Sequence, residues 1–338
     1  MPRILATIAA LALAVPAAGG PCIRGAAACS EWVGLGSRGG DRSLVYRSFP
    51  LDTRNDRIRR VLVIVHGAER QAGDYFELGL AAARLEGALD DTLVIAPRFA
   101  SSDGITCRDT LAAGELNWPC DGNSWRSGGF ARASRLTSFD LADEILRKVS
   151  RRSIFPNLRA IVVAGHSAGG QFVTRYQMAN RVHDTLGIPV RYVVANPSSY
   201  AYPEAVRPVV TEGRVVFKPF EGGSCASFDW WPYGLRERMG YTEHTDAAVL
   251  ARQLKERPTT YLLGEDDIFP VALFDSSCAA MTQGGTRLAR GRAFAAYVND
   301  RLGGHHALTI VPACGHDAGC MFTANASLPA LFPKTDSH

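Results

Sequence analysis

The fold of this chain is decided by residues 160–170, which read AIVVAGHSAGG. Residues 160–164 form a short, largely β-branched apolar run that is typical of a buried strand, and a helix is predicted to begin near Gln171. A serine between such a strand and helix lies on a tight, strained turn that projects its hydroxyl from the sheet, and the flanking glycines avoid clashes with neighbouring elements. The pattern therefore predicts that Ser167 is a nucleophile.

A serine hydroxyl is a weak nucleophile until a base removes its proton, and that base must be oriented by a carboxylate. For a serine on this kind of turn, the partners follow along the chain in the order serine, acid, histidine, each after a strand. A predicted strand at 259–263 precedes two adjacent candidates, Asp266 and Asp267, and a predicted strand at 307–311 precedes His316. We therefore expect His316 to be the base and Asp267 or Asp266 to be the acid.

Strands and helices alternate along most of the chain. Short runs that are apolar on both faces are typical of strands buried between two helical layers. Amphipathic segments between these runs predict helices, and Ser138 is a suitable N-terminal cap for one of them. The alternation predicts an α/β fold with a mostly parallel central sheet and helices on both faces. The other predicted strands lie at 60–65, 92–96 and 190–195, with an edge strand at 43–49, and the predicted helices lie at 138–148, 171–181 and 289–302.

Two long segments, 98–134 and 197–257, interrupt this alternation. Long irregular insertions in a compact domain are usually functional or disordered, and the aromatic and cysteine residues here favour ordered ones. We expect them to form loops and a cap over Ser167 within one catalytic domain at 21–338. Their large aromatic side chains either form small cores of the insertions' own or contribute to an apolar substrate site. These side chains are Trp118, Trp125, Tyr200, Tyr202, Trp230 and Trp231.

The first twenty residues are typical of a secretory signal peptide. Arg3 is followed by an apolar run at 4–15 and then by small residues, which is the order of regions in such a peptide. The run is shorter than the roughly 20 residues that a membrane-spanning helix needs. We predict a signal peptide at 1–20, no stable membrane anchor, and a secreted or periplasmic protein.

The chain has 8 cysteines, all of them after the predicted signal peptide. An even number of cysteines in an exported protein indicates disulfides. Spacing leaves many pairings open, and proximity along the chain favours one set. A zinc site is disfavoured because the chain has no Cys-x-x-Cys pair, and we expect neither a metal nor a cofactor. The favoured pairs are Cys22–Cys29, Cys107–Cys120, Cys225–Cys278 and Cys314–Cys320.

The charge balance argues against one class of partner. The net charge is +4, from 37 basic and 33 acidic residues among 338, and so small an excess does not indicate nucleic-acid binding. Two short basic runs, at 57–60 and 147–152, lack interleaved aromatic side chains and are typical of solvated surface. We therefore predict no nucleic-acid partner, and the sequence does not indicate an oligomeric state.

Four motifs together resemble those of a known superfamily. They are VIVHG at 63–67, GHSAGG at 165–170, GEDD at 264–267 and CGHD at 314–317. The chain resembles the α/β hydrolases, and among them the secreted serine esterases that include feruloyl esterases and polyhydroxyalkanoate depolymerases. The resemblance covers residues 43–325 and implies an α/β-hydrolase fold.

The resemblance also bears on individual residues. It selects Asp267 over Asp266, because the acid in that family commonly lies three residues after the glycine that ends the strand. An oxyanion needs fixed N–H donors, and one of them is the amide directly after the nucleophile, that of Ala168. The second donor comes from the loop after the first buried strand, where we assign Ala68, with Glu69 as the alternative.

These expectations combine into one predicted activity. We expect a secreted carboxylic ester hydrolase that acts on a small-molecule or polymeric ester through a Ser-His-Asp triad and a covalent acyl-enzyme. A serine peptidase or amidase, or a polyester depolymerase, is the alternative on the same fold, since the triad serves both kinds of bond. A non-catalytic binding protein is disfavoured, because a binder does not need the intact set of serine, histidine and acid.

Overall fold

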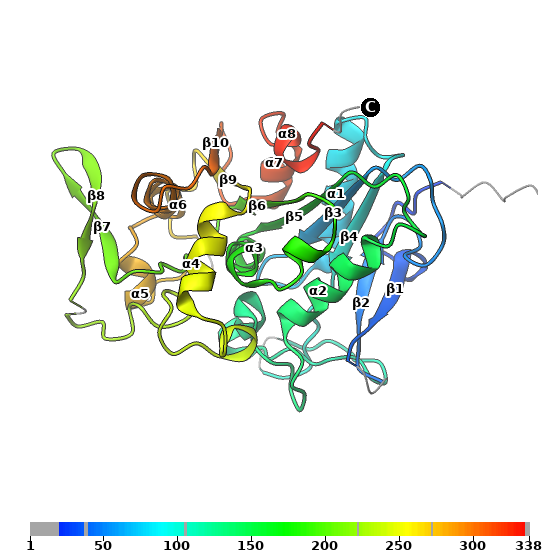
Figure 1. The fold of residues 1–338 in the computed structure, drawn as a ribbon, viewed down its shortest axis with the longest axis horizontal. Helices are drawn as coiled ribbons and strands as arrows, with labels where there is room; N and C mark the ends of the chain where they lie inside the picture. Colours follow the sequence, from blue (N-terminus) through cyan, green and yellow to red (C-terminus); the bar gives the residue numbers. More distant parts are fainter. Residues whose placement is uncertain (1–19, 37–39, 105–106, 222, 272, 335–338) are drawn as a thin grey trace, which may run out of the picture.

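The computed structural model describes residues 20–36, 40–104, 107–221, 223–271 and 273–334. The predicted signal peptide at 1–20 lies outside the described residues, except for Gly20. Within them, eight strands form one sheet in the order β1-β2-β4-β3-β5-β6-β9-β10, and two more form a separate hairpin, β7-β8. The sheet runs through the middle of the molecule between helices (Figure 1). Its strands are β1 (Ser30–Gly34), β2 (Arg42–Arg47), β3 (Arg60–Val65), β4 (Thr92–Pro97), β5 (Ala160–His166), β6 (Val190–Ala195), β9 (Thr259–Gly264) and β10 (Ala307–Val311).

Most of the sheet is parallel. Strand β3 pairs in parallel with β4 and with β5, and the parallel pairing continues through β6 and β9 to β10. One edge differs, because β2 runs antiparallel to β4 and to β1. The predicted α/β class with a mostly parallel sheet is confirmed. The predicted edge strand is β2, and β1, which lies outside it, was not predicted.

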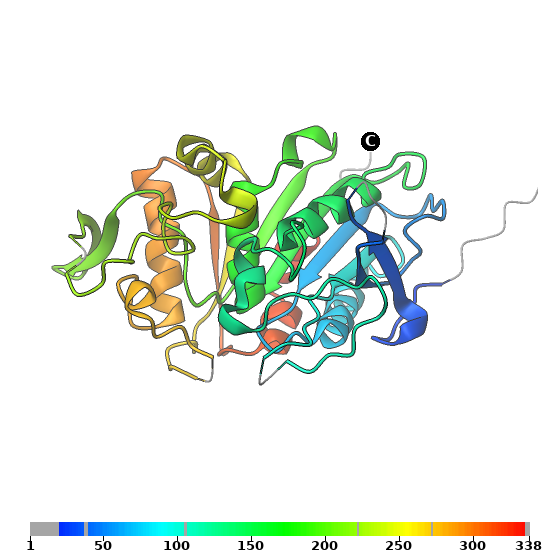
Figure 2. The same ribbon diagram turned by 90° about the horizontal axis from the view of Figure 1, so that it is seen from below.

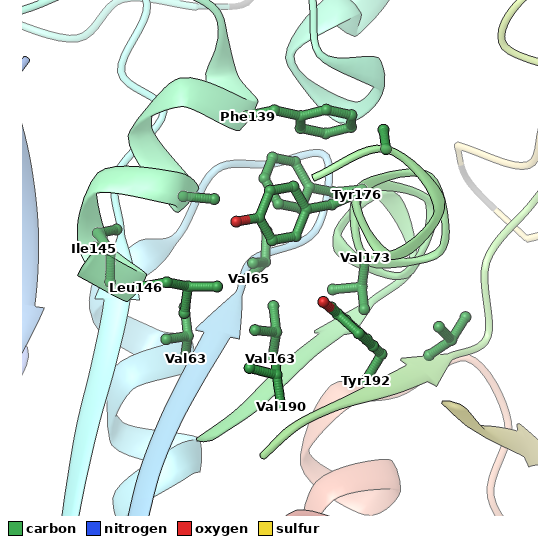
Figure 3. Close-up of a cluster of buried hydrophobic side chains, with 14 of the residues drawn as sticks. Val63, Val65, Phe139, Ile145, Leu146, Val163, Val173, Tyr176, Val190 and Tyr192 are labelled. Atoms are coloured by element: carbon green, nitrogen blue, oxygen red, sulfur yellow. The ribbon is translucent and has the colours of Figure 1, made fainter. Parts of the chain in front are cut away.

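The hydrophobic core has one half on each face of the sheet. Side chains alternate along a strand, so Val63 and Val65 of β3 point into one half and Leu62 and Ile64 into the other. Figure 3 shows the first half, where side chains of two helices lie over the valines of β3 and β5.

The helices divide between the two faces. Helices α2, α3, α4 and α6 contribute buried side chains to one half of the core, and α1, α7 and α8 contribute to the other. This arrangement buries both faces of the parallel strands, as their continuous apolar runs require. The helices are α1 (Ala72–Leu85), α2 (Ser138–Val149), α3 (Ala168–Ala179), α4 (Ala247–Glu256), α5 (Cys278–Met281), α6 (Arg287–Ala296), α7 (Ala318–Thr323) and α8 (Leu328–Leu331), with short turns η1 (Ala27–Cys29), η2 (Asp121–Ser127), η3 (His183–Thr185), η4 (Gly240–Thr242) and η5 (Tyr297–Arg301).

Helix α2 begins at a reciprocal pair of side-chain caps. Thr137 Oγ1 accepts a hydrogen bond from the Asp140 amide at 3.2 Å, and Asp140 Oδ2 accepts one from the Thr137 amide at 2.8 Å. The pair satisfies two backbone donors that the helix itself leaves free. The predicted cap at Ser138 is therefore wrong by one residue. The Ser138 hydroxyl instead donates to the carbonyl of Trp125 at 2.5 Å and ties the helix to the neighbouring segment.

The two segments predicted to be irregular fold differently from each other. The described residues of 98–134 form loops and the short helix η2, and Trp118 and Trp125 among them are fully buried. Residues 197–257 contain the hairpin of β7 (Val206–Thr211) and β8 (Arg214–Pro219), which projects from one end of the molecule (Figures 1 and 2). They also contain the regular helix α4, so the irregular stretch ends before α4 and not at 257.

All four predicted disulfides are present. They join Cys22 to Cys29, Cys107 to Cys120, Cys225 to Cys278 and Cys314 to Cys320. The last of these closes a loop that contains His316. Among the residues that the structure describes, no helix is both long and apolar enough to cross a membrane.

Candidate active site

Ser167 lies on the turn between β5 and α3. Its backbone has a positive φ of 57° with a ψ of −117°, which is strained for a residue with a Cβ. The turn is tight, because a Cβ at Gly165 would overlap the backbone of Gly169, and one at Gly169 would overlap the carbonyl of Val65. The two glycines of the motif therefore allow β5, α3 and β3 to approach closely, and the Ser167 side chain reaches the wall of an open cleft.

The structure brings the three predicted triad residues together from the ends of β5, β9 and β10. His316 Nε2 lies 3.0 Å from Ser167 Oγ, and His316 Nδ1 lies 2.9 Å from Asp267 Oδ2. A carboxylate can only accept, so Nδ1 carries the proton and Nε2 is free to accept from the serine hydroxyl. Of the two candidate acids, Asp267 faces His316, while the Asp266 side chain is exposed.

A buried arginine holds the other oxygen of the acid. Arg287 of α6 places Nη1 3.5 Å from Asp267 Oδ1, and both side chains are almost completely buried. Arg287 Nε donates a hydrogen bond to Ser198 Oγ at 2.7 Å. Burial lowers the pKa of Arg287, and the charge of Asp267 opposes that shift. The pair places a positive charge against the carboxylate and fixes its orientation toward His316.

Asn196 connects the loops that carry the acid and the base. Its Oδ1 accepts from the Gly264 amide at 2.8 Å, and its Nδ2 donates to the Gly315 carbonyl at 3.1 Å. The residue has a positive φ of 44°, a conformation that asparagine tolerates better than most residues. One side chain at the end of β6 therefore sets the spacing of two catalytic loops.

His66 shapes the loop that follows β3. Its Nδ1 lies 2.8 Å from the Gly67 carbonyl, and its Nε2 accepts from the Phe99 amide at 3.3 Å. These contacts define a neutral ring with the proton on Nδ1. The side chain is fully buried, and burial lowers its pKa to about 4. His66 therefore serves the conformation of this loop.

Arg70 anchors the same loop to the segment 98–134. Its guanidinium donates to the carbonyls of Phe99 at 2.8 Å, Trp118 at 3.1 Å and Pro119 at 2.8 Å. Burial lowers the pKa of Arg70 to about 10. A side chain held by three carbonyls of one segment positions the loop between β3 and α1 as a rigid unit.

Ala168 and Ala68, which are predicted to supply the oxyanion donors, both lie beside Ser167. The Ala168 amide is the first of α3, and the first amides of a helix have no partner within it. The loop after β3 approaches the nucleophile, because a Cβ at Gly67 would lie 3.9 Å from Ser167 Cβ. Ala68 and Glu69 both line the cleft beside Ser167, so either amide can be the second donor.

A second histidine lies beside His316. The rings of His166 and His316 have their centroids 4.6 Å apart. His166 Nδ1 lies 3.2 Å from the Tyr75 hydroxyl, and burial lowers the pKa of His166 well below its usual value. A neutral His166 supports the ring of His316 without adding a permanent positive charge beside it.

The cleft beside Ser167 has a volume of about 810 Å³. Its walls come from the loop after β3, from α1, from the loop after β9 and from the start of α7. None of the described residues of 98–134 or 197–257 lines it, so the expectation that these segments cover Ser167 is wrong. Their aromatic side chains serve the core: four of the six are fully buried, Trp231 is 7% exposed, and the 42% exposed Trp230 lies outside the cleft lining.

The sequence did not point to three residues that support the site: Arg287, Asn196 and Arg70. Arg287 lies within a helical segment and is one of many arginines, so nothing local marks it. Asn196 directly follows a predicted strand, and Arg70 follows the VIVHG motif; these positions were the available signals. Among the residues described, no group of three or more histidine, cysteine, aspartate or glutamate side chains is placed to hold a metal ion.

Known proteins were compared with the chain. Its sequence matches no protein-family model and no curated protein. Its structure is similar to that of the LpqC poly(3-hydroxybutyrate) depolymerase from Bordetella parapertussis, with 24% identity and a TM-score of 0.59 over 86% of this chain and 84% of that one. It is also similar to poly(aspartic acid) hydrolase-1 from Sphingomonas sp. KT-1, with 24% identity and a TM-score of 0.60 over 86% of this chain and 95% of that one. These similarities, together with the sheet order and the serine turn, establish that the chain has an α/β-hydrolase fold.

Proposed function

We propose that this protein is a carboxylic ester hydrolase that uses Ser167, His316 and Asp267 as its catalytic triad. One observation carries the proposal: a serine on a strained turn lies 3.0 Å from a histidine that is itself 2.9 Å from a buried carboxylate. This connection of nucleophile, base and orienting acid is what acyl transfer needs. It lies at an open cleft, where a substrate can reach the serine.

The reaction proceeds by two acyl transfers. Ser167 Oγ attacks the ester carbonyl while His316 Nε2 takes its proton, and the amides of Ala168 and of Ala68 or Glu69 stabilise the oxyanion. The intermediate collapses to an acyl-enzyme, and His316 returns the proton to the leaving alcohol. Water then attacks the acyl-enzyme with His316 again as base, which releases the acid and restores Ser167. Asp267 orients His316 and stabilises its protonated form in both halves.

The proposal also covers the export of the protein and the kind of substrate that it hydrolyses. The four disulfides and the predicted signal peptide support export to the periplasm or the medium. A polyester depolymerase is the second candidate, favoured by the similarity to a structure described as a poly(3-hydroxybutyrate) depolymerase. Amide hydrolysis by the same triad stays an alternative outcome of the test.

The test is hydrolysis of p-nitrophenyl esters of increasing acyl length by the purified protein and by matched variants. We expect activity that Ser167→Ala abolishes, with a chain-length optimum that measures the acyl site. Asp267→Asn should lower kcat by about 10⁴-fold, because it places the imidazole in the wrong tautomer. Asp266→Asn is the control for the neighbouring exposed carboxylate and should leave kcat within twofold of the wild type.

The outcomes separate the candidates. Equal activity of the wild type and Ser167→Ala would mean that another residue is the nucleophile. No activity on any simple ester, with release of oligomers from a polyester film or of amines from peptides, would move the assignment to a depolymerase or a peptidase.

A further inference from the structure

One wall of the cleft beside Ser167 is acidic. Glu69, Asp74, Glu77 and Asp317 all line it, and no lysine or arginine is among the described residues that do so. This is opposite in sign to the chain as a whole, which has a net charge of +4. The negative charge is therefore concentrated locally at the cleft.

The four carboxylates are exposed, and within the described part of the chain none of them forms an ion pair. Two have local tasks: Glu77 accepts from the Gly25 amide at 2.9 Å, and Asp317 accepts from the Cys320 amide at 2.6 Å. A hydrogen bond from an amide leaves the carboxylate charge in place. The wall thus presents uncompensated negative charge to the cleft.

The charges act at the interior of the cleft. Tyr75 also lines it. Burial first, and then the charges of Glu69, Asp317 and Asp74, raise the pKa of its phenol. The Tyr75 hydroxyl lies 3.2 Å from His166 Nδ1, and the ring of His166 lies beside that of His316.

Another part of the cleft lining is apolar. Val271 and Leu273, from the loop after Asp267, line the cleft and are 46% and 62% exposed. Ile268 and Phe269 of the same loop are exposed as well. Exposed apolar surface at a cleft is typical of a site that binds an apolar group of a ligand.

We infer that the cleft selects esters that combine an apolar part with a neutral or positively charged end and discriminates against anionic esters. The carboxylates alone would not define a binding site, but here they line the cavity that holds the nucleophile. His166, which is 3% exposed, also lines this cleft, and its buried Nε2 atom has no partner among the described residues. This selectivity deepens the proposed ester hydrolysis and rests on it.

The inferred selectivity depends on the electric field that the carboxylates produce inside the cleft. Charges of one sign lining a cleft raise the local concentration of ligands of opposite sign and speed their association. The effect is screened over about 8–10 Å at physiological salt, so it acts within the cleft and weakens as salt is added. A polyanionic chain threaded past four carboxylates would be repelled at every position.

The experiment compares three p-nitrophenyl esters of matched length that differ in charge. They are the 4-(trimethylammonio)butanoate, its uncharged carbon isostere the 5,5-dimethylhexanoate, and the hemiglutarate. At about 20 mM ionic strength we expect kcat/KM for the cation to be at least tenfold above that for the anion, with the isostere between them. In 0.5 M NaCl the difference should shrink to about two- to threefold.

Matched variants connect the selectivity to the wall. Glu69→Gln combined with Asp74→Asn removes two charges that make no hydrogen bond among the described residues, and should reduce the ratio of cation to anion rates at least threefold. Glu243→Gln combined with Asp300→Asn removes the same number of exposed charges outside the cleft lining. This control pair should leave the ratio as in the wild type.

The outcomes keep the two proposals apart. Hydrolysis of the uncharged isostere that depends on Ser167, with equal rates for cation and anion at low salt, would overturn the inference and leave the esterase proposal standing. An equal loss of selectivity in both double variants would also overturn the inference. The selectivity would then come from the net charge of the protein and not from the acidic wall. Failure to hydrolyse the isostere and every linear p-nitrophenyl ester of the first test would overturn the esterase proposal and the inference with it.

Discussion

The chemistry proposed for this protein depends on how one carboxylate is held. Asp267 has only two oxygens to satisfy: Oδ2 faces His316 at 2.9 Å and Oδ1 faces Arg287 at 3.5 Å. In a buried site an unpaired charge is far more costly than a paired one, so loss of either partner disturbs the other. Arg287 is therefore a positioning residue that acts through Asp267.

The residue-scale prediction concerns Arg287→Met. We expect kcat to fall at least tenfold, equivalent to about 1.4 kcal/mol of transition-state stabilisation. The acidic limb of the pH–rate profile should move to higher pH, because removal of a nearby positive charge favours the imidazolium form of His316. Arg287→Lys should restore part of the activity and move the limb back.

The control for this prediction is Arg290→Met. Arg290 is also fully buried and lies on the same helix, but it donates to the carbonyls of Ser198 and Asp275 and not to the acid. The Arg290→Met variant should be less stable than the wild type and should keep the wild-type pH–rate profile. An unshifted profile in Arg287→Met would show that the arginine only maintains the fold.

At the scale of elements, the segment 98–134 has a different role from the one that its aromatic residues suggested. It contributes no described residue to the cleft lining, and three of its carbonyls hold the guanidinium of Arg70. Through Arg70 it fixes the loop that carries the second proposed oxyanion donor. The insertion therefore acts on the reaction from outside the cleft.

We expect Arg70→Met to lower kcat by roughly 10- to 100-fold with little change in KM. A displaced oxyanion donor weakens binding of the transition state more than that of the substrate. The measurement is steady-state kinetics on a p-nitrophenyl ester, with Arg98→Met as the control. Arg98 pairs with Asp109 and Glu115 inside the same segment. A loss confined to KM, or equal losses in both variants, would speak against this role.

The disulfide between Cys314 and Cys320 holds the loop that carries His316. The two cysteines are 6 residues apart and enclose His316. Cys314 lies before α7, and Cys320 lies within it. We expect the double variant Cys314→Ser, Cys320→Ser to lower kcat at least fivefold, because the base is then held less firmly. The matched control removes Cys22–Cys29, which has a separation of 7 and does not enclose a catalytic residue. Unchanged kcat in the first variant would remove the disulfide from the account of catalysis.

At the scale of the whole molecule, buried neutral histidines make the free energy of unfolding depend on pH. His66 and His306 lie on different elements, and burial lowers the pKa of each from 6.5 to about 4. In the unfolded chain both histidines bind protons near pH 6.5, whereas in the folded protein they stay neutral down to about pH 4. Their contribution to stability is therefore complete above about pH 6.5 and is lost as the pH falls toward 4.

We expect the free energy of unfolding to fall between pH 7 and pH 5 by about 2 kcal/mol for each of these histidines. Denaturant unfolding of the oxidised protein at the two pH values measures the fall. His306→Gln should reduce the difference between the two pH values, while His244→Gln, at an exposed position, should leave it as in the wild type. A free energy of unfolding that is the same at pH 5 and pH 7 would contradict the account.

The parts of this molecule that the sequence predicted are those encoded by local pattern. The β-branched runs, the glycines around Ser167 and the short cysteine spacings each report a local requirement, and the strands, the turn and the disulfides follow from them. The resemblance chose Asp267, and the structure turns that carboxylate and not Asp266 toward His316.

Long-range packing explains what the sequence did not predict. Arg287 meets Asp267 only because α6 folds back over β9, and no local signal marks that contact. Trp118 and Trp125 lie in loop sequence, yet they fill the core where η2 packs against α3, so composition could not distinguish a core from a substrate site. Part of the cleft lining comes from α1 and from the loop after Asp267, which carry no motif.

The most direct test of the central claim is covalent labelling of the nucleophile. The purified protein is treated with a fluorophosphonate, and the adduct is located by intact mass and peptide mapping. We expect a single adduct on the peptide containing Ser167, loss of ester hydrolysis in proportion to labelling, and no adduct in Ser167→Ala. An adduct on another serine, or full ester hydrolysis after complete labelling of Ser167, would contradict it.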